Sequence, residues 1–204
     1  MYVLFTDTDC DITVEGARKL NYNVISMPYT IDDKDVYPNE DYEVFDGKAY
    51  YDILRSGKLP STSAISEAKY MSYFEPFFQE GKDILYVHFS SAMSMTFQNL
   101  EKAIAALKEK YPERNFYRID TKGISILSLN ILYEVSDMYK EGKSAEEIIK
   151  WAETEVDKFA VYFFADDLKF FKKSGRVNGI TATMGNLIGI RPIIYVDICQ
   201  RTWR

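Results

Sequence analysis

The sequence predicts an α/β protein built around a mainly parallel sheet with flanking helices. Short apolar segments with the character of strands alternate with longer segments in which apolar residues recur at the helical period. Such an alternation implies parallel strands joined by right-handed crossovers, with helices on both faces of the sheet. With 204 residues and 47% apolar content, the chain can also bury a sizeable core.

The first half of the chain opens with four apolar residues, Tyr2 to Phe5, which predict a short buried strand. Segments of helical spacing and further apolar runs follow it. In order, the expected elements are a strand over residues 2–5, a helix over 12–20, a strand over 23–29, helices over 50–56 and 68–78, and a strand over 83–89.

The second half continues the alternation. Leu100, Ile104 and Leu107 are three or four residues apart and therefore share one face of a helix. Ser144 and Glu147 match the capping box that starts a helix. The expected elements are a helix over residues 94–110, a strand over 116–119, helices over 124–139 and 144–156, and strands over 160–164 and 192–196.

The alternation breaks near Lys143, and we place a domain boundary close to this point. Residues 1–155 are expected to form an N-terminal α/β domain. Residues 156–204 are expected to form a smaller α/β C-terminal domain, in which a Gly-punctuated stretch precedes the last strand.

Composition excludes several classes of function. The net charge of −6 argues against a nucleic-acid partner, because a basic face is needed to neutralise phosphates. No membrane span is expected, since no apolar run is long enough, and the N-terminus lacks a signal-peptide pattern, so we expect a cytoplasmic protein. Cys10 and Cys199 are too few and too far apart for a disulfide framework or a zinc site. We expect neither a metal nor a cofactor.

Polar loops follow the expected strands, and ligands of parallel sheets bind at the carboxyl ends of the strands. Any one such Ser, Thr or Asp is more commonly a helix N-cap. Several segments at the same sheet edge, however, predict a site for one carboxylate or phosphate. Arg176 is either an anion clamp or a surface residue after a helix. The loop segments are Thr6–Asp11, Ser61–Ser66, Ser90–Thr96 and Asp120–Gly123.

The order of these segments resembles the DegV family of fatty-acid-binding proteins, which are the lipid-carrying subunits of bacterial fatty acid kinases. The resemblance covers nearly the whole chain. It rests on a Thr-Asp-rich loop after the first strand (5–11), Pro-x-Thr-Ser (60–63), Ser-Ser-x-x-Ser-x-Thr (90–96), Asp-Leu-x-x-x-x-Lys-x-Gly-Arg (167–176) and Gly-Ile-x-Pro-Ile-Ile (189–194).

The resemblance implies a long-chain fatty acid whose carboxylate is held where the two domains meet, with its tail in an apolar tunnel of the C-terminal domain. Thr62 and Ser94 match the family's carboxylate-binding hydroxyls, Ser63 stands beside them, and Arg176 matches the Gly-Arg position; Ser91 is a further candidate. The chain would be no enzyme itself. A partner kinase would supply ATP and form the acyl phosphate, which agrees with the absence of a Walker loop from the sequence.

Two departures from the family pattern bear on this site. Met95 stands where relatives usually have Gly, which alters the backbone approach to a ligand. Family members usually continue beyond the equivalent of Arg204 and supply a His to the carboxylate site, so the C-terminal domain is expected to be truncated and to enclose the lipid only in part. The one histidine, His88, is expected to pack within the sheet.

The sequence also permits a second function, from another class of protein. An Asp-x-Asp loop after an apolar strand resembles the magnesium-dependent phosphatases of the haloacid-dehalogenase type, with Asp7 as the nucleophile and Asp9 as the acid/base. This alternative gives no role to the Pro-Ser-Thr-Ser segment at 60–63 or to the Lys-Ser-Gly-Arg segment at 173–176.

Overall fold

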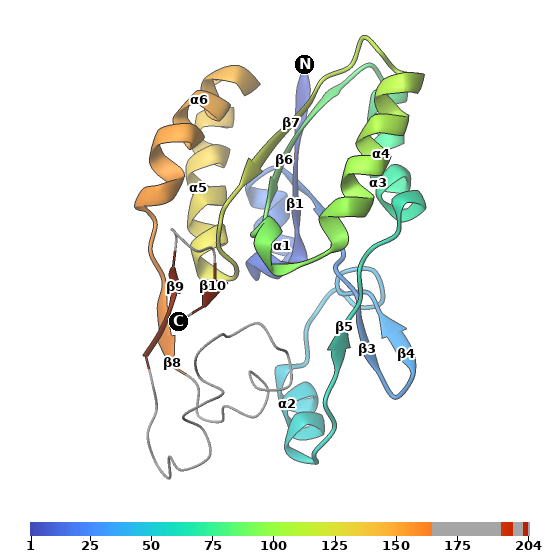
Figure 1. Ribbon diagram of the computed structural model, residues 1–204, viewed down its shortest axis with the longest axis vertical. Coiled ribbons are helices and arrows are strands. Elements are labelled where there is room, and N and C mark those ends of the chain that lie inside the picture. The colour runs from blue at the N-terminus through green and yellow to red at the C-terminus, as the bar shows by residue number, and fades with distance from the viewer. Residues whose placement is uncertain (165–192, 198–201, 204) are drawn as a thin grey trace.

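The computed structural model describes residues 1–164, 193–197 and 202–203, with the side chains of the first range and of 193–195 (Figure 1). At its centre lies a sheet of four parallel strands in the order β2-β1-β6-β7. These strands are β1 (Tyr2–Asp7), β2 (Tyr22–Ile25), β6 (Asp83–His88) and β7 (Phe116–Asp120). The predicted α/β class with a parallel sheet is therefore confirmed.

Side chains that alternate along the strands bury the two faces of this sheet in separate clusters. On one face, Leu4, Leu85 and Val87 pack against α1 (Val14–Lys19), α5 (Ile126–Lys140) and α6 (Ala145–Glu155). On the other face, Phe5, Ile84 and Tyr86 pack against α3 (Glu67–Gln79) and α4 (Thr96–Lys110). Figure 1 shows the resulting three layers, with helices on both sides of the sheet.

A small antiparallel sheet interrupts the region that was predicted as one strand over residues 23–29. Strand β2 ends at Ile25, and β3 (Tyr29–Ile31) pairs instead with β4 (Lys34–Val36) and β5 (Ser61–Thr62). The single strand was wrong because Pro28 has no N–H to continue a ladder. Asp32 and Asp33 both have positive φ and form the tight turn of the β3–β4 hairpin.

Helix α2 (Gly47–Arg55) connects this small sheet's strands β4 and β5 and lies away from the parallel sheet (Figure 1). Its start is capped by Asp46, whose side chain accepts from the backbone N–H of Ala49. No residue of α2 is buried, so packing in the core does not hold this helix in place.

The capping box of α6 is present, with Ser144 and Glu147 each bonded to the other's backbone N–H. Beyond it, β8 (Tyr162–Phe164) pairs antiparallel with β9 (Ile193–Asp197), which also pairs with β10 (Thr202–Trp203). Arg176 and Cys199 lie outside the described residues. Within the part that the structure describes, no helix is both long and apolar enough to cross a membrane.

Candidate functional site

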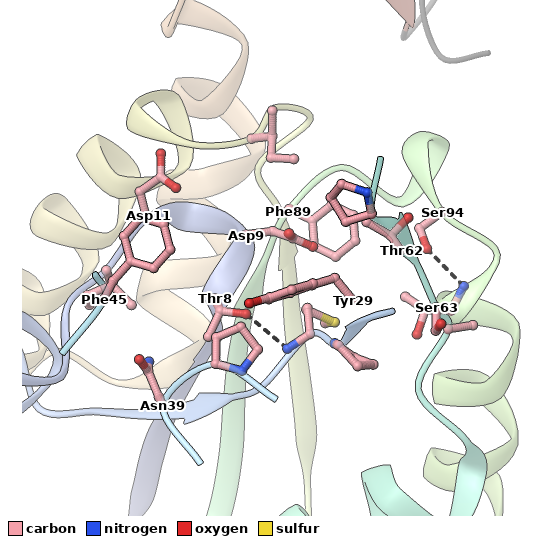
Figure 2. Close-up of a pocket in the computed structure, with 18 of the residues that line it drawn as sticks. Thr8, Asp9, Asp11, Tyr29, Asn39, Phe45, Thr62, Ser63, Phe89 and Ser94 are labelled. Atoms are coloured by element: carbon pink, nitrogen blue, oxygen red, sulfur yellow. Dashed lines mark hydrogen bonds between the residues drawn. The ribbon is translucent and has the colours of Figure 1, made fainter. Parts of the chain in front are cut away.

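A pocket of about 840 Å³ lies beyond the carboxyl ends of the parallel strands (Figure 2). Its walls come from the segments that follow β1, β2 and β6, and from the small antiparallel sheet with the residues around it. This is the edge at which parallel sheets bind ligands, because loops from neighbouring strands meet there. The location agrees with the one predicted from the polar loops.

The loop after β1 is fixed by two side-chain hydrogen bonds. Asp7 caps the short helix η1 (Thr8–Cys10) by accepting from the backbone N–H of Asp9, with 3.2 Å between the atoms. The hydroxyl of Thr8 accepts from the backbone N–H of Met27 at 2.9 Å, as Figure 2 shows. The loops that follow β1 and β2 are therefore joined, and both line the pocket.

Thr62, Ser63 and Ser94 all line this pocket and gather at one end of it in Figure 2. The first two come from β5 and its end, and Ser94 precedes α4. The Ser94 hydroxyl accepts from the backbone N–H of Thr96 at 3.2 Å, which leaves its own proton for another acceptor. The Ser63 hydroxyl lies 3.0 Å from that of Thr30.

Ser91 is placed differently. It is not among the described residues that line the pocket, and its hydroxyl donates to the carboxylate of Asp120 at 2.5 Å. Of the loop after β7, only Ile124 reaches the pocket. The other side chains of this loop have partners elsewhere: Lys122 forms an ion pair with Asp157, and the hydroxyl of Thr121 is hydrogen-bonded to that of Ser128. Three of the four predicted loop segments thus meet at the pocket, and the fourth turns away from it.

The charge of the pocket wall is negative. Asp9, Asp11 and Glu43 line it, whereas no Lys, Arg or His does so among the residues that the structure describes. Neutral hydroxyls, backbone groups and the side-chain amide of Asn39 are therefore the donors that the described wall offers to an anion. Asp11 is itself engaged, since it accepts a hydrogen bond from the hydroxyl of Ser125.

Asp7 lies beneath the pocket and does not line it. Its side chain is fully buried, and burial, followed by the nearby Asp9, raises the pKa of its carboxyl well above the usual range. The carboxylate accepts from the hydroxyl of Tyr86 at 3.0 Å and from the N–H groups of Phe89 and Asp9, both at 3.2 Å. A nucleophile has to reach its substrate, so nothing in this arrangement supports the phosphatase alternative.

Two further observations concern metal and histidine chemistry. Among the described residues, no group of His, Cys, Asp and Glu side chains is arranged to hold a metal ion. His88 is buried between the rings of Tyr86 and Phe97, with ring centroids 5.2 and 4.6 Å away, and its Nδ1 lies 2.7 Å from the carbonyl oxygen of Phe89. It packs within the sheet, as expected.

An aromatic wall was not predicted as part of the site. Tyr50 is its centre, with ring centroids 5.6 Å from Tyr29 and 5.4 Å from Phe45. Tyr42 and Phe89 also line the pocket. No local pattern in the sequence separates these rings from the aromatic residues that fill the sheet faces.

The chain is similar to known proteins both in sequence and in structure. A family model described as "Uncharacterised protein, DegV family" matches residues 1–201. A DegV domain-containing protein of Clostridium perfringens is 34% identical over 196 residues, which are 96% of this chain and 67% of that protein. The chain thus spans about two thirds of the length of this relative.

Two solved structures share the fold. One is a fatty acid (stearic acid)-binding protein from Eubacterium ventriosum, with a TM-score of 0.82 and 22% identity over 96% of this chain and 67% of that one. The other reports fatty acid binding by a DegV family protein from Thermus thermophilus, with a TM-score of 0.82 and 22% identity over 99% of this chain and 69% of that one.

Proposed function

The chain belongs to the DegV family, and on that premise we propose that it binds a long-chain fatty acid by its carboxylate. One observation carries the proposal: Thr62, Ser63 and Ser94, which come from two separate family motifs, line the same end of one pocket. Relatives of the same fold from Eubacterium ventriosum and Thermus thermophilus are described as binding fatty acids.

The chemistry of the pocket suits such a ligand. A carboxylate that leaves water needs hydrogen bonds to offset its desolvation, and hydroxyls at one end of the pocket provide donors. The aromatic wall offers apolar surface next to them. Burial of a sixteen-carbon tail at ~0.8 kcal/mol per methylene contributes on the order of ten kcal/mol, which is comparable with the cost of association. The tail therefore provides affinity, and the hydroxyls orient the ligand.

The chain acts in this proposal as a carrier rather than as an enzyme. It presents the bound acid to a partner kinase in the cytoplasm, and the partner supplies ATP and forms the acyl phosphate. Arg176 is proposed to assist at the carboxylate, whereas Ser91, whose hydroxyl donates to Asp120, is given no direct contact with the ligand. The absence of a Walker loop from the sequence supports a division of labour in which another subunit binds the nucleotide.

We also propose that residues 1–155 form the domain that holds the carboxylate and that residues 156–204 begin the domain that encloses the tail. This division is supported by the pairing of the strands. In the part of the chain that the structure describes, β8, β9 and β10 form a sheet of their own, which shares no ladder with the parallel sheet.

The direct test is to extract the purified protein with organic solvent and to identify co-purified fatty acid by mass spectrometry. A long-chain acid in roughly equimolar amount is expected. Thr62→Ala and Ser94→Ala should lower the amount retained while the protein stays folded by circular dichroism. Lipid-free protein that also fails to bind added palmitate, or unchanged affinity in both variants, would contradict the proposal.

A further inference from the structure

Four polar residues are buried at or beneath the floor of the pocket, on the sheet face that is covered by α3 and α4. They are Asp7, Tyr70, Tyr86 and Thr96, none of which is more than 1% exposed. Tyr70 and Tyr86 otherwise belong to an apolar cluster, in which phenylalanine would pack without a hydroxyl to satisfy. A buried hydroxyl is costly unless it is hydrogen-bonded, so these groups call for an explanation beyond packing.

Polar contacts join the four residues in a row. The hydroxyl of Tyr86 donates to Asp7 at 3.0 Å, and the hydroxyl of Tyr70 interacts with Tyr86. At its other side, the Tyr70 hydroxyl lies 3.1 Å from that of Thr96, which accepts from the backbone N–H of Ile65 at 3.1 Å. We call this row the Asp7–Thr96 network.

The ends of the network are attached to the segments that form the pocket wall. At one end, the carboxylate of Asp7 accepts from the backbone N–H groups of Asp9 and Phe89, which follow β1 and β6. At the other end, Ile65 comes directly after the Ser61–Ala64 stretch of the wall. Ile65 is held a second time by its carbonyl, which accepts from the side chain of Asn99 at 2.8 Å.

Thr96 connects the network to the hydroxyl end of the pocket. Its side chain belongs to the network, and its backbone N–H donates to the hydroxyl of Ser94. The N–H of Ile65 can only donate, so the hydroxyl of Thr96 is the acceptor of that bond. Bonds that follow one another in this way hold their members more tightly than isolated pairs do.

We infer that the Asp7–Thr96 network is a positioning device that holds Thr62 and Ser94 at the distance that a ligand carboxylate requires. Asp7, Tyr70 and Tyr86 are positioning residues, because they do not line the pocket, whereas Thr96 belongs both to the network and to the pocket wall. The inference rests on the proposed function, since it assigns a purpose to the spacing of the hydroxyls. Sites of this kind depend on supporting side chains that lock the binding groups in place.

The test uses Tyr86→Phe and Tyr70→Phe in the full chain, which remove one oxygen atom each and preserve the ring. Tyr22→Phe is the matched control: Tyr22 is also buried and donates to the carbonyl of Leu132 at 3.2 Å, but on the opposite face of the sheet. Palmitate affinity is measured by isothermal titration calorimetry, and amide hydrogen exchange is followed by NMR in the protein without ligand.

Each network variant is expected to weaken palmitate binding about five- to tenfold, whereas the control stays within about twofold of the wild type. Tyr86→Phe should also speed amide exchange at Ile65, although Tyr86 makes no direct hydrogen bond to that residue. A role in stability alone would affect all three variants alike and would leave the exchange at Ile65 unchanged relative to the control.

Failure of the inference can be told apart from failure of the proposed function. If the wild type binds no palmitate, the proposed function fails, and the exchange at Ile65 still decides whether the network transmits position. If the wild type binds palmitate and the two network variants match Tyr22→Phe in affinity and in exchange, the inference is overturned.

Discussion

The hydroxyl groups of Ser63 and Thr30 lie 3.0 Å apart, and Ser63 is the donor of this hydrogen bond. The assignment follows because Thr30 gives its own proton to the carboxylate of Asp35 at 2.6 Å. The backbone N–H of Ser63 is also engaged, with the carbonyl of Pro28 at 3.2 Å. Ser63 therefore uses both of its donors within the small sheet.

Ser63 is accordingly expected to contribute less to carboxylate binding than Thr62. Ser63→Ala should leave palmitate affinity within about threefold of the wild type, whereas Thr62→Ala should weaken it about tenfold, the loss typical of one hydrogen bond to a charged group. Titration calorimetry of both variants measures the difference. Equal losses would mean that Ser63 turns its hydroxyl toward the ligand on binding.

Ser94 is expected to have two separable roles. Its hydroxyl accepts from the N–H of Thr96 and so supports the start of α4, and it lines the pocket. Ser94→Ala should cost about 1 kcal/mol of unfolding free energy, as loss of one hydrogen bond at the start of a helix does, and should also weaken palmitate binding about tenfold.

Ser66→Ala is the matched control for this prediction. Ser66 caps α3 by accepting from the N–H of Lys69 at 3.2 Å, and it is not among the described residues of the pocket wall. It should lose similar stability in urea unfolding and retain full affinity. A comparable loss of affinity in Ser66→Ala would show that helix capping, rather than contact with the ligand, explains the effect of Ser94→Ala.

Stability should fall in mildly acidic solution because of His88. Burial lowers the pKa of its ring from 6.5 to about 4. The unfolded chain therefore takes up a proton near pH 6.5 that the folded chain takes up only near pH 4. The stabilisation is complete above pH 6.5 and is lost as the pH falls toward 4, by about 2 to 3 kcal/mol.

Two measurements check this prediction. Urea unfolding between pH 7 and pH 4 should show a steeper loss of stability for the wild type than for His88→Phe. Because the sequence contains one histidine, NMR can also follow its ring protons without ambiguity. A ring that titrates near pH 6.5 in the folded protein would refute the predicted pKa.

Gly123 should not tolerate a side chain. A Cβ atom at this position would lie 2.5 Å from Cδ2 of Leu127, which is buried in the core. Gly123→Ala is expected to cost about 1 to 3 kcal/mol, because the leucine must move within a packed environment. Thermal unfolding measures the loss, and an unchanged midpoint would show that Leu127 has another rotamer available.

Strong apolar runs made most of the parallel sheet predictable. The strands expected over residues 83–89 and 116–119 differ from β6 and β7 by one residue. Helix α6 was predicted equally well, because its capping box consists of two residues that are close in the sequence, Ser144 and Glu147. The prediction of one strand over residues 23–29 was wrong, because apolar residues continue through the point where Pro28 ends the ladder.

Residues of the candidate site were predictable only where they lie next to regular strands and helices. Thr62, Ser63 and Ser94 meet because their segments reach the same edge of the sheet, a consequence of topology. Phe45 and Tyr42 belong to a stretch without periodicity, so no pattern indicated that they face the pocket. Asp7 was read as a possible nucleophile because sequence does not report burial, and burial decides its role.

The central position of β1 has a consequence for folding. Its partner β6 follows only after β2, the small antiparallel sheet, α2 and α3, and Tyr2 pairs with Asp83 at the far end of that excursion. Contacts between distant parts of a chain carry a large loop-closure entropy and slow folding. During synthesis the first strand can pair on one edge with β2, but its other edge must wait for residues made much later. The pocket, whose walls depend on both strands, is then among the last features to appear, and any ligand present at that moment would favour the finished state by mass action.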